Sequence, residues 1–202
     1  TQSAYYAAPP GVPSVLSLHN LDSSVARSSA RQRSGLAWVR EQNRAAALRV
    51  VERRVLPLAD RVLCVSEADA NAVFAAGGRA LLAPNGVDDE FFQTPLTDAG
   101  ERAFFFGHFG YEANLRGVER FLEEGWPDVL RARPGARLAI AGGGMGAAVR
   151  ARLAAVEGVE VLGLVADLPG ALAASRAVVV PIWEGGGTRL KVLEALAAGR
   201  AV

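Results

Sequence analysis

From Ala103 onward, the sequence alternates short, continuous apolar runs with segments whose apolar residues recur at helical spacing. Strands that are apolar on both faces need helices on both sides of their sheet, and a helix between consecutive strands makes those strands parallel. This half of the chain is therefore predicted to be a doubly wound α/β domain. The expected strands cover 103–106, 136–141, 159–162 and 177–182, with another starting at 201, and the expected helices cover 115–133, 147–156, 168–175 and 188–198.

The first half repeats the alternation less regularly. Strands are expected at 12–17, 61–65 and 80–83, with helices at 34–56 and 67–75, and turn residues at 84–88 precede a domain boundary. We therefore expect two domains, 1–95 and 96–202. Three strands are few beside the usual sheet of about five or six, and the last strand stops as it starts. The first domain is expected to be incomplete and the second truncated at its C-terminal end.

Composition excludes several classes of function. The 22 basic and 21 acidic residues nearly balance, which disfavours a nucleic-acid partner. No apolar run approaches the roughly 20 residues of a membrane-spanning helix. The one cysteine, Cys64, cannot form an internal disulfide and fits a reducing, cytoplasmic location. Metal-binding motifs such as Asp-x-Asp and His-Glu-x-x-His are missing, so no metal is expected.

The strongest candidate site is the segment 181–195, where a strand end, a glycine-rich loop and a helix start follow one another. Glycines let backbone N–H groups approach an anion closely, and a helix N-terminus favours negative charge. The chain's single lysine lies here. A glycine-rich turn beside a solvated helix face is the structural alternative, and we favour a diphosphate site. Its candidate residues are Gly185, Gly186, Gly187, Thr188, Arg189, Lys191 and, as a ribose ligand, Glu194.

Three other loops follow predicted strands. Gly142 begins a Gly-Gly-Gly-Met-Gly-Ala run with Glu160 further on, which matches a weak dinucleotide pattern, and a tight turn explains these glycines equally well. His108 or Arg116 could face an anionic ligand after the first strand of the second half. His19, at the end of the first strand, is a further candidate donor to a phosphate or sugar.

The run Gly185 to Ala195, followed by Gly-Arg-Ala-Val at 199–202, resembles the retaining GT-B glycosyltransferases of family four. Further motifs occur in the family's order over nearly the whole chain: Val-Ser-Glu at 65–67, Pro-Asn-Gly-Val-Asp at 84–88, and the glycine loop from 142. The resemblance implies a GT-B fold with two Rossmann-like domains. It also implies a nucleotide-sugar donor bound by the second domain, an unidentified glycan, lipid or small-molecule acceptor bound mainly by the first, and neither cofactor nor metal.

Residue roles follow from the same resemblance. Glu194 would bind the ribose, while Arg189 and Lys191 would lie near the diphosphate or the sugar. The base would meet the segment Gly163, Leu164 and Val165. His19 would contact the donor sugar or its phosphate, and Arg116 would stabilise the leaving diphosphate.

One position departs from the family's pattern. The family often has a glutamate eight residues before the second one, and this chain has Gly186 there. Sugar contacts made by that glutamate are therefore in question, and Glu184 is out of register as a substitute. A lipid acceptor would add peripheral association with the inner face of the membrane.

Three other functions stay open at the level of sequence. The first is a NAD-dependent oxidoreductase built on the Gly142 loop, with Glu160 as its ribose ligand. Its glycine pattern would follow the second strand of the domain instead of the usual first, which counts against it. The second is a non-catalytic nucleotide-binding fragment. The third is a GT-B nucleotide-sugar epimerase, which a shared fold does not exclude.

Overall fold

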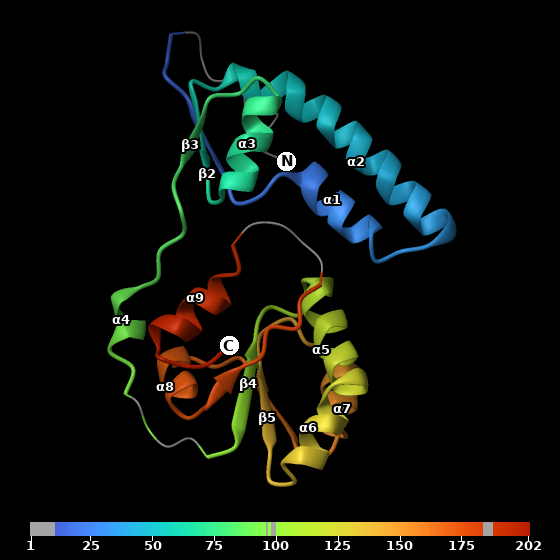
Figure 1. The fold of residues 1–202 in the computed structure, drawn as a ribbon, viewed down its shortest axis with the longest axis vertical. Coiled ribbons are helices and arrows are strands. Elements are labelled where there is room, and N and C mark those ends of the chain that lie inside the picture. Colours follow the sequence, from blue (N-terminus) through green and yellow to red (C-terminus); the bar gives the residue numbers. More distant parts are fainter. Residues whose placement is uncertain (1–10, 96, 98–99, 184–187) are drawn as a thin grey trace. The chain divides into compact units, whose positions relative to one another are not determined.

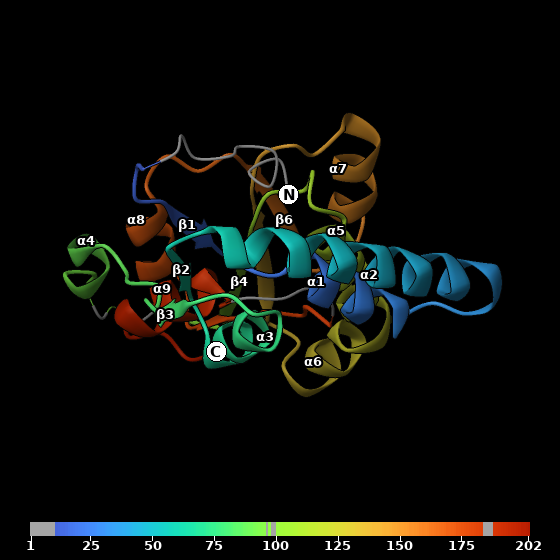
Figure 2. The same cartoon turned by 90° about the horizontal axis from the view of Figure 1, so that it is seen from above.

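The computed structural model describes residues 11–95, 97, 100–183 and 188–202. These residues form two compact units, one of 11–85 with Thr188 and the other of 86–183 with 189–202. Each contains a parallel β-sheet with α-helices, which confirms the predicted α/β class (Figures 1 and 2). No helix in these ranges is both long and apolar enough to cross a membrane.

The first unit is built on three parallel strands in the order β1-β2-β3. The strand β1 was expected slightly earlier, at 12–17, and β2 and β3 lie where the sequence predicts them. The elements are β1 (Val15–Leu18), α1 (Asp22–Ala30), α2 (Gly35–Val55), the 3₁₀ helix η2 (Leu56–Leu58), β2 (Arg61–Cys64), α3 (Glu67–Ala75) and β3 (Ala80–Leu82).

The helix α1 was not predicted, because its sequence is rich in serine and lacks a row of large apolar residues. Its stability comes from packing against α2, beside which it lies (Figure 2). Ala26 and Ala30 are buried. The buried carboxylate of Glu52 accepts hydrogen bonds from the Ser23 N–H at 2.9 Å and the Ser23 hydroxyl at 2.5 Å. Tertiary contacts thus override weak helix propensity here.

The core of the first unit lies between its sheet and its helices. Cys64 is fully buried there with Val62 and Val73, as its apolar context predicts. Burial raises the pKa of the Cys64 thiol, and the charge of Asp69 adds to this effect. Ser66 caps α3 by accepting a hydrogen bond from the Asp69 N–H at 3.1 Å.

The second unit has four parallel strands in the order β6-β5-β4-β7, and Ala201 forms an isolated parallel bridge with Ala177 of β7. Its elements are α4 (Asp89–Phe92), β4 (Arg102–Phe106), α5 (Glu112–Glu124), α6 (Trp126–Ala132), β5 (Arg137–Ala141), α7 (Ala147–Ala154), β6 (Val159–Gly163), α8 (Leu168–Ala173), β7 (Ala177–Val178) and α9 (Leu190–Ala197).

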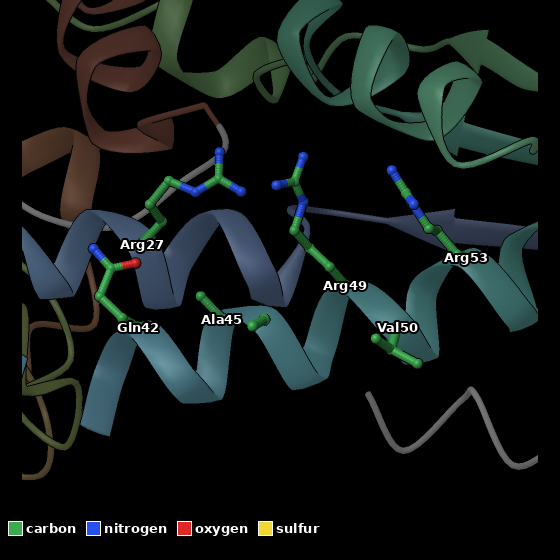
Figure 3. A pocket seen from close by; sticks show the side chains of 7 residues that line it. Arg27, Gln42, Ala45, Arg49, Val50 and Arg53 are labelled. Atoms are coloured by element: carbon green, nitrogen blue, oxygen red, sulfur yellow. The ribbon is translucent and has the colours of Figure 1, made fainter. Parts of the chain in front are cut away.

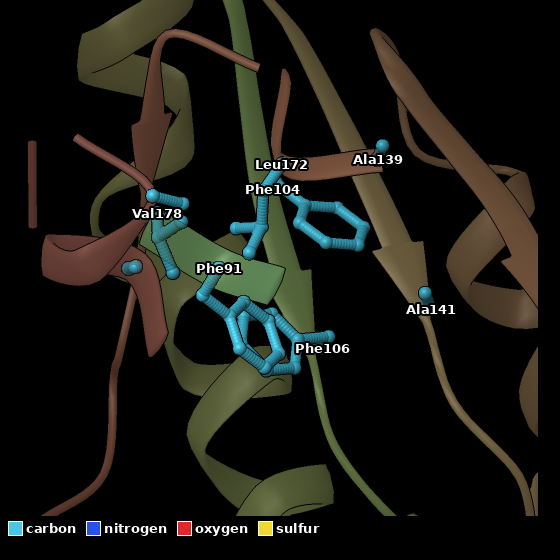
Figure 4. Close-up of a cluster of buried hydrophobic side chains, with 9 residues drawn as sticks. Phe91, Phe104, Phe106, Ala139, Ala141, Leu172 and Val178 are labelled. Carbon is cyan, nitrogen blue, oxygen red and sulfur yellow. The ribbon is translucent and has the colours of Figure 1, made fainter. Parts of the chain in front are cut away.

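Helices cover both faces of this sheet, as doubly wound topology requires. Figure 1 shows α5, α6 and α7 on one side of β4 and β5, and α8 and α9 on the other. Strand residues alternate between the two cores. Phe104 and Phe106 point to the α8–α9 side, where Phe91 and Val178 join them (Figure 4). Phe105 points to the opposite core.

The largest differences from the prediction in this unit concern one helix and one strand. The helix expected over 115–133 divides at Gly125 into α5 and α6, and Pro127 lies in the first turn of α6. A proline lacks the N–H that continues a helix, and the first turn is where it is tolerated. The strand expected over 177–182 pairs at 177–178 alone. Beyond it, the Ile182 N–H donates to the Val180 carbonyl, which turns the chain.

The stretch before residue 96 packs with the second unit. Phe91 is buried in the core under α9, and Val87 packs against the same cluster. The Pro95 carbonyl accepts a hydrogen bond from the buried guanidinium of Arg200. The compact unit thus starts at Gly86, while the boundary at residues 95 and 96, expected just after the turn residues 84–88, stays a prediction.

Candidate functional site in the second unit

The strand order places a topological switch point between β4 and β7. The chain moves outward from β4 to β5 and β6, and then returns to the other side of β4 with β7. In open parallel sheets, ligands bind beyond the carboxyl ends of the strands at such a point, because the loops diverge there. The loop after β4 and the start of α9 both lie at this edge.

Lys191 is held at this edge by one helix, α5, and one strand, β4. Its ammonium donates a hydrogen bond to the Asn114 Oδ1 of α5 at 3.0 Å. It also lies 4.4 Å from the ring centroid of Phe105, in a cation–π contact. The Asn114 amide donates in turn to the His108 carbonyl at 2.8 Å, which fixes its orientation. Lys191 is therefore positioned by neutral groups that leave its positive charge in place.

The charges around Lys191 show how the site would treat an anion. Burial, and secondarily the charge of Arg189, lower the pKa of Lys191 to about 8, while Glu194 acts in the opposite direction. Burial raises the pKa of Glu194, and the charge of Lys191 partly offsets that shift. A half-buried ammonium beside a second cation is stabilised when an anion arrives.

Two glycine loops approach each other closely. The first follows β4 and contains Gly107, and the second follows β5 and begins at Gly142. A Cβ on Gly142 would lie 1.8 Å from the Gly107 carbonyl oxygen, and Gly142 has a φ of 150°. The Gly142 N–H donates to the Gly163 carbonyl at 2.7 Å. Gly142 therefore permits the close approach of the loops, and its N–H is already used within the protein. The role of Gly142 as a substrate contact stays a prediction from the sequence.

His108 lies over the second of these loops. Its Nδ1 accepts a hydrogen bond from the Gly110 N–H at 3.1 Å, so Nε2 is the donor in this arrangement. A Cβ on Gly144 would lie 2.8 Å from His108 Cε1 and 3.1 Å from Nε2. The missing side chain at Gly144 thus makes room for the imidazole. The sequence raised His108 as an open alternative, without choosing it as a site residue.

The predicted base-binding segment lies at the end of β6. Gly163 has a φ of 77°, which favours glycine, and a Cβ there would lie 2.5 Å from Arg150 Nη2 of α7. Leu164 is 84% exposed, while Val165 packs against the core under α8 and α9. The segment therefore offers an exposed apolar side chain next to a guanidinium. Arg150 was missed, although it lies only four residues after Gly146, because an arginine within a helix gives no signal of its own in the sequence.

Asn114 was missed as well, although its loop was singled out. Asn114 is neutral, whereas His108 and Arg116 in the same segment are the residues that could face an anionic ligand on charge alone. Arg116 lies two residues further along α5, about 200° around the helix from Asn114, and forms an ion pair with Glu112 at 2.6 Å. The structure thus groups Lys191 with Asn114, and places the Arg116 side chain on another face of α5. Its predicted role at the diphosphate stays a prediction.

The remaining predicted residues are placed as follows. Gly185, Gly186 and Gly187 lie outside the described residues. Thr188 and Arg189 are half-buried, and Arg189 is the N-cap residue of α9. His19 follows β1 in the first unit and is exposed. Among the described residues, no group of three or more His, Cys, Asp and Glu side chains could hold a metal ion.

Glu160 does not fit the dinucleotide alternative. It is the second residue of β6, near the amino end of the strand, and its carboxylate pairs with Arg102 Nη2 at 3.1 Å. Arg102 is the first residue of β4. Because a ribose ligand is needed at the carboxyl edge, this geometry disfavours the oxidoreductase.

Family comparisons cover nearly the whole chain. A model described as "Glycosyl transferases group 1" matches residues 100–202. A second, described as "Glycosyltransferase Family 4", matches residues 2–91. A comparison with curated proteins gave no match. The first match spans half of the chain, including every described candidate residue of the second unit.

Solved structures share the fold. HepE from Anabaena, in a complex with UDP and glucose, matches with a TM-score of 0.58 and 18% identity, over 93% of this chain and 51% of that one. An α,α-trehalose-phosphate synthase (UDP-forming) from Burkholderia vietnamiensis matches with a TM-score of 0.54 and 14% identity, over 92% and 51%. The chain thus spans about half the length of these structures, and the predicted GT-B fold is confirmed.

Proposed function

This chain belongs to the glycosyl transferases group 1 family, and from that membership we propose that it transfers a sugar from a nucleoside-diphosphate donor to an acceptor. The supporting observation is the half-buried ammonium of Lys191 at the topological switch point, oriented by Asn114 and Phe105. The neighbours HepE and trehalose-phosphate synthase have UDP in their descriptions. The acceptor we propose is a glycan, a lipid or a small molecule.

In this proposal, the acceptor hydroxyl forms a bond to the anomeric carbon while the bond from that carbon to the diphosphate oxygen breaks. The acceptor's proton leaves with the diphosphate, and the transition state resembles an oxocarbenium ion. Lys191 and Arg189 stabilise the negative charge that grows on the departing diphosphate. Retention of configuration, and stabilisation by side-chain cations without a metal, are part of the proposal. They rest on the family resemblance.

The proposed location is the cytoplasm, where nucleotide sugars would be available to the donor site. Peripheral association with the inner face of the membrane accompanies the lipid alternative for the acceptor. His19 of the first unit and Arg116 of α5 are proposed to contribute to the donor's sugar and diphosphate, on the resemblance alone.

The direct test of the donor site is Glu194→Ala. We expect the affinity for a nucleoside diphosphate to fall by about 1–3 kcal/mol, because a carboxylate that accepts ribose hydroxyl hydrogen bonds is removed. A thermal-shift panel of UDP, GDP, ADP and NAD would first identify the base, and calorimetry would then compare the variant. An unchanged affinity would remove Glu194 from the site, and stabilisation by NAD alone would support the oxidoreductase.

Donor affinity should also depend on pH. The pKa of Lys191 is lowered to about 8, so raising the pH through 8 converts the free protein from the ammonium to the neutral amine. A diphosphate prefers the ammonium, and its own phosphates have lost their protons below this range, with a second pKa of about 6. We expect affinity to fall up to about tenfold per pH unit above 8.

Calorimetric titrations between pH 7 and 9.5 measure this dependence. In Lys191→Arg, the guanidinium stays charged throughout, so the decline should disappear. A decline of equal steepness in both proteins would assign the titration to another group.

A further inference from the structure

A pocket in the first unit carries three arginines that the donor site does not use. It lies between α1 and α2, has a volume of about 290 Å³, and is distinct from all residues discussed for the second unit. Its size falls near the lower end of ligand pockets, which hold roughly 300–1,000 Å³. We call it the arginine pocket. Its lining residues are Arg27, Gln42, Ala45, Ala46, Arg49, Val50 and Arg53.

The helix geometry explains both the hollow and its charge. Arg49 and Arg53 are four residues apart on α2, so they extend from the same face of that helix. Ala45 and Ala46, one turn earlier, have side chains too small to fill the space. Figure 3 shows Arg27 of α1 pointing to the same side as Arg49 and Arg53. Three arginine side chains thus line a space that small side chains leave open.

The three positive charges exceed the acidic charge that the neighbouring pocket lining supplies. In the described ranges 11–95, 97, 100–183 and 188–202, none of the three guanidinium groups forms an ion pair or a side-chain hydrogen bond. One acid, Glu52, lines an adjoining pocket with the same arginines. Both of its oxygens accept hydrogen bonds from Ser23. The carboxylate is therefore committed to holding the two helices together.

The segment that forms α1 and α2 is strongly basic, which also favours an anionic ligand. Residues 22–55 contain eight arginines and three acids, a net charge of +5, whereas the complete chain has +1. The rest of the chain therefore carries −4. Basic charge gathered in one helical pair, with three of its arginines lining one pocket, attracts anions to that place.

We propose that the arginine pocket binds a phosphate group. The planar guanidinium fork matches phosphate oxygens in a bidentate manner, and several forks around one space suit a doubly charged phosphate better than a single carboxylate. The Gln42 amide adds a neutral donor to the lining. The phosphate belongs to a small soluble molecule or to a lipid headgroup, and the chemistry of recognition is the same for both. The pocket lies within the first unit, so this inference does not rest on the proposed donor site.

The test is a titration of the isotope-labelled full chain with inorganic phosphate and then pyrophosphate at constant ionic strength. NMR signals of α1 and α2 report the arginine pocket, while signals of α9 report the donor site, so the two sites are read separately. Arg49→Gln/Arg53→Gln should weaken binding at α1 and α2 by about tenfold or more, on the scale of lost charge-assisted hydrogen bonds. Circular dichroism checks that the variant stays folded.

The matched control is Arg40→Gln/Arg54→Gln, which removes the same charge from the same helix outside the pocket lining. It should change the dissociation constant less than about twofold, since its charges act from a distance. If both double variants lost the same affinity, the binding would be a general electrostatic attraction and the proposal would be overturned. It would also be overturned if neither anion perturbed the signals of α1 and α2. Vesicles with phosphatidate, tested on the same variants, show whether the phosphate of a lipid headgroup binds through these arginines.

Discussion

Replacing Lys191 with methionine is expected to weaken nucleoside-diphosphate binding by about 10- to 100-fold, the scale of a lost charge-assisted hydrogen bond. Methionine keeps the length of the side chain and its contact with Phe105, and removes the ammonium. The same substitution should not lower the melting temperature, because burial already destabilises the charged form of Lys191. Calorimetry with the nucleotide that stabilises the unmodified chain measures the first effect, and thermal unfolding measures the second.

A matched control is Arg131→Met, which removes an exposed cation of α6 that pairs with Asp128 at 2.6 Å. Its effect on affinity should be under about twofold, because exposed ion pairs contribute little and salt screens them. A clear fall in the melting temperature of the Lys191 variant would identify the lysine as a structural residue of α9. Unchanged affinity would contradict the donor site itself.

Gly117→Ala should destabilise the second unit by about 3 kcal/mol, near the upper end of the usual cost of overpacking. A Cβ at this position would lie 2.0 Å from the Pro181 carbonyl oxygen and 3.3 Å from Ile182 Cδ1. The helix and the chain after β7 would have to separate at the switch point. On an exposed helix, the same change would stabilise by up to about 1 kcal/mol, so even the sign of the result is informative.

Thermal unfolding should show this destabilisation as a fall in the melting temperature of roughly 6–12 °C, since each kcal/mol lowers it by about 2–4 °C in a chain of this length. The control is Gly146→Ala, whose new Cβ would meet no atom within 4 Å. It should change stability by less than about 1 kcal/mol. If both variants had the same melting temperature, the close approach of Gly117 to Pro181 would not contribute to stability.

The sequence was sufficient for the fold class because the apolar runs of the second unit are fully buried strands. Phe104, Phe105 and Ile140 are completely inaccessible to solvent. Continuous apolar runs of this length, separated by helical segments, are typical of buried parallel strands. The helices α1 and α4 escaped prediction for the opposite reason. The helix α1 depends on contacts with Glu52, which lies far away in sequence. The helix α4 is short, and it depends on the burial of its own Phe91 in the core of the second unit.

For the candidate site, sequence reasoning found charged residues and missed the neutral residue that orients one of them. Lys191 stood out as the single lysine, and its loop had recognisable glycine chemistry. Asn114 lies 77 residues away and meets it because β4 and β7 are neighbours in the sheet. The order of the strands in the sheet determines such contacts between distant residues, and this order cannot be read from the spacing of residues along the chain.

The lone lysine also has a practical consequence for chemical labelling. Of the 22 basic residues, 21 are arginines, so Lys191 supplies the chain's only side-chain amine. With a pKa of about 8, a large share of this amine is nucleophilic at mildly alkaline pH, unlike an ordinary lysine with a pKa of about 10.4. An amine-directed acylating reagent therefore has one lysine target in these 202 residues, and that target lies at the switch point of the second sheet.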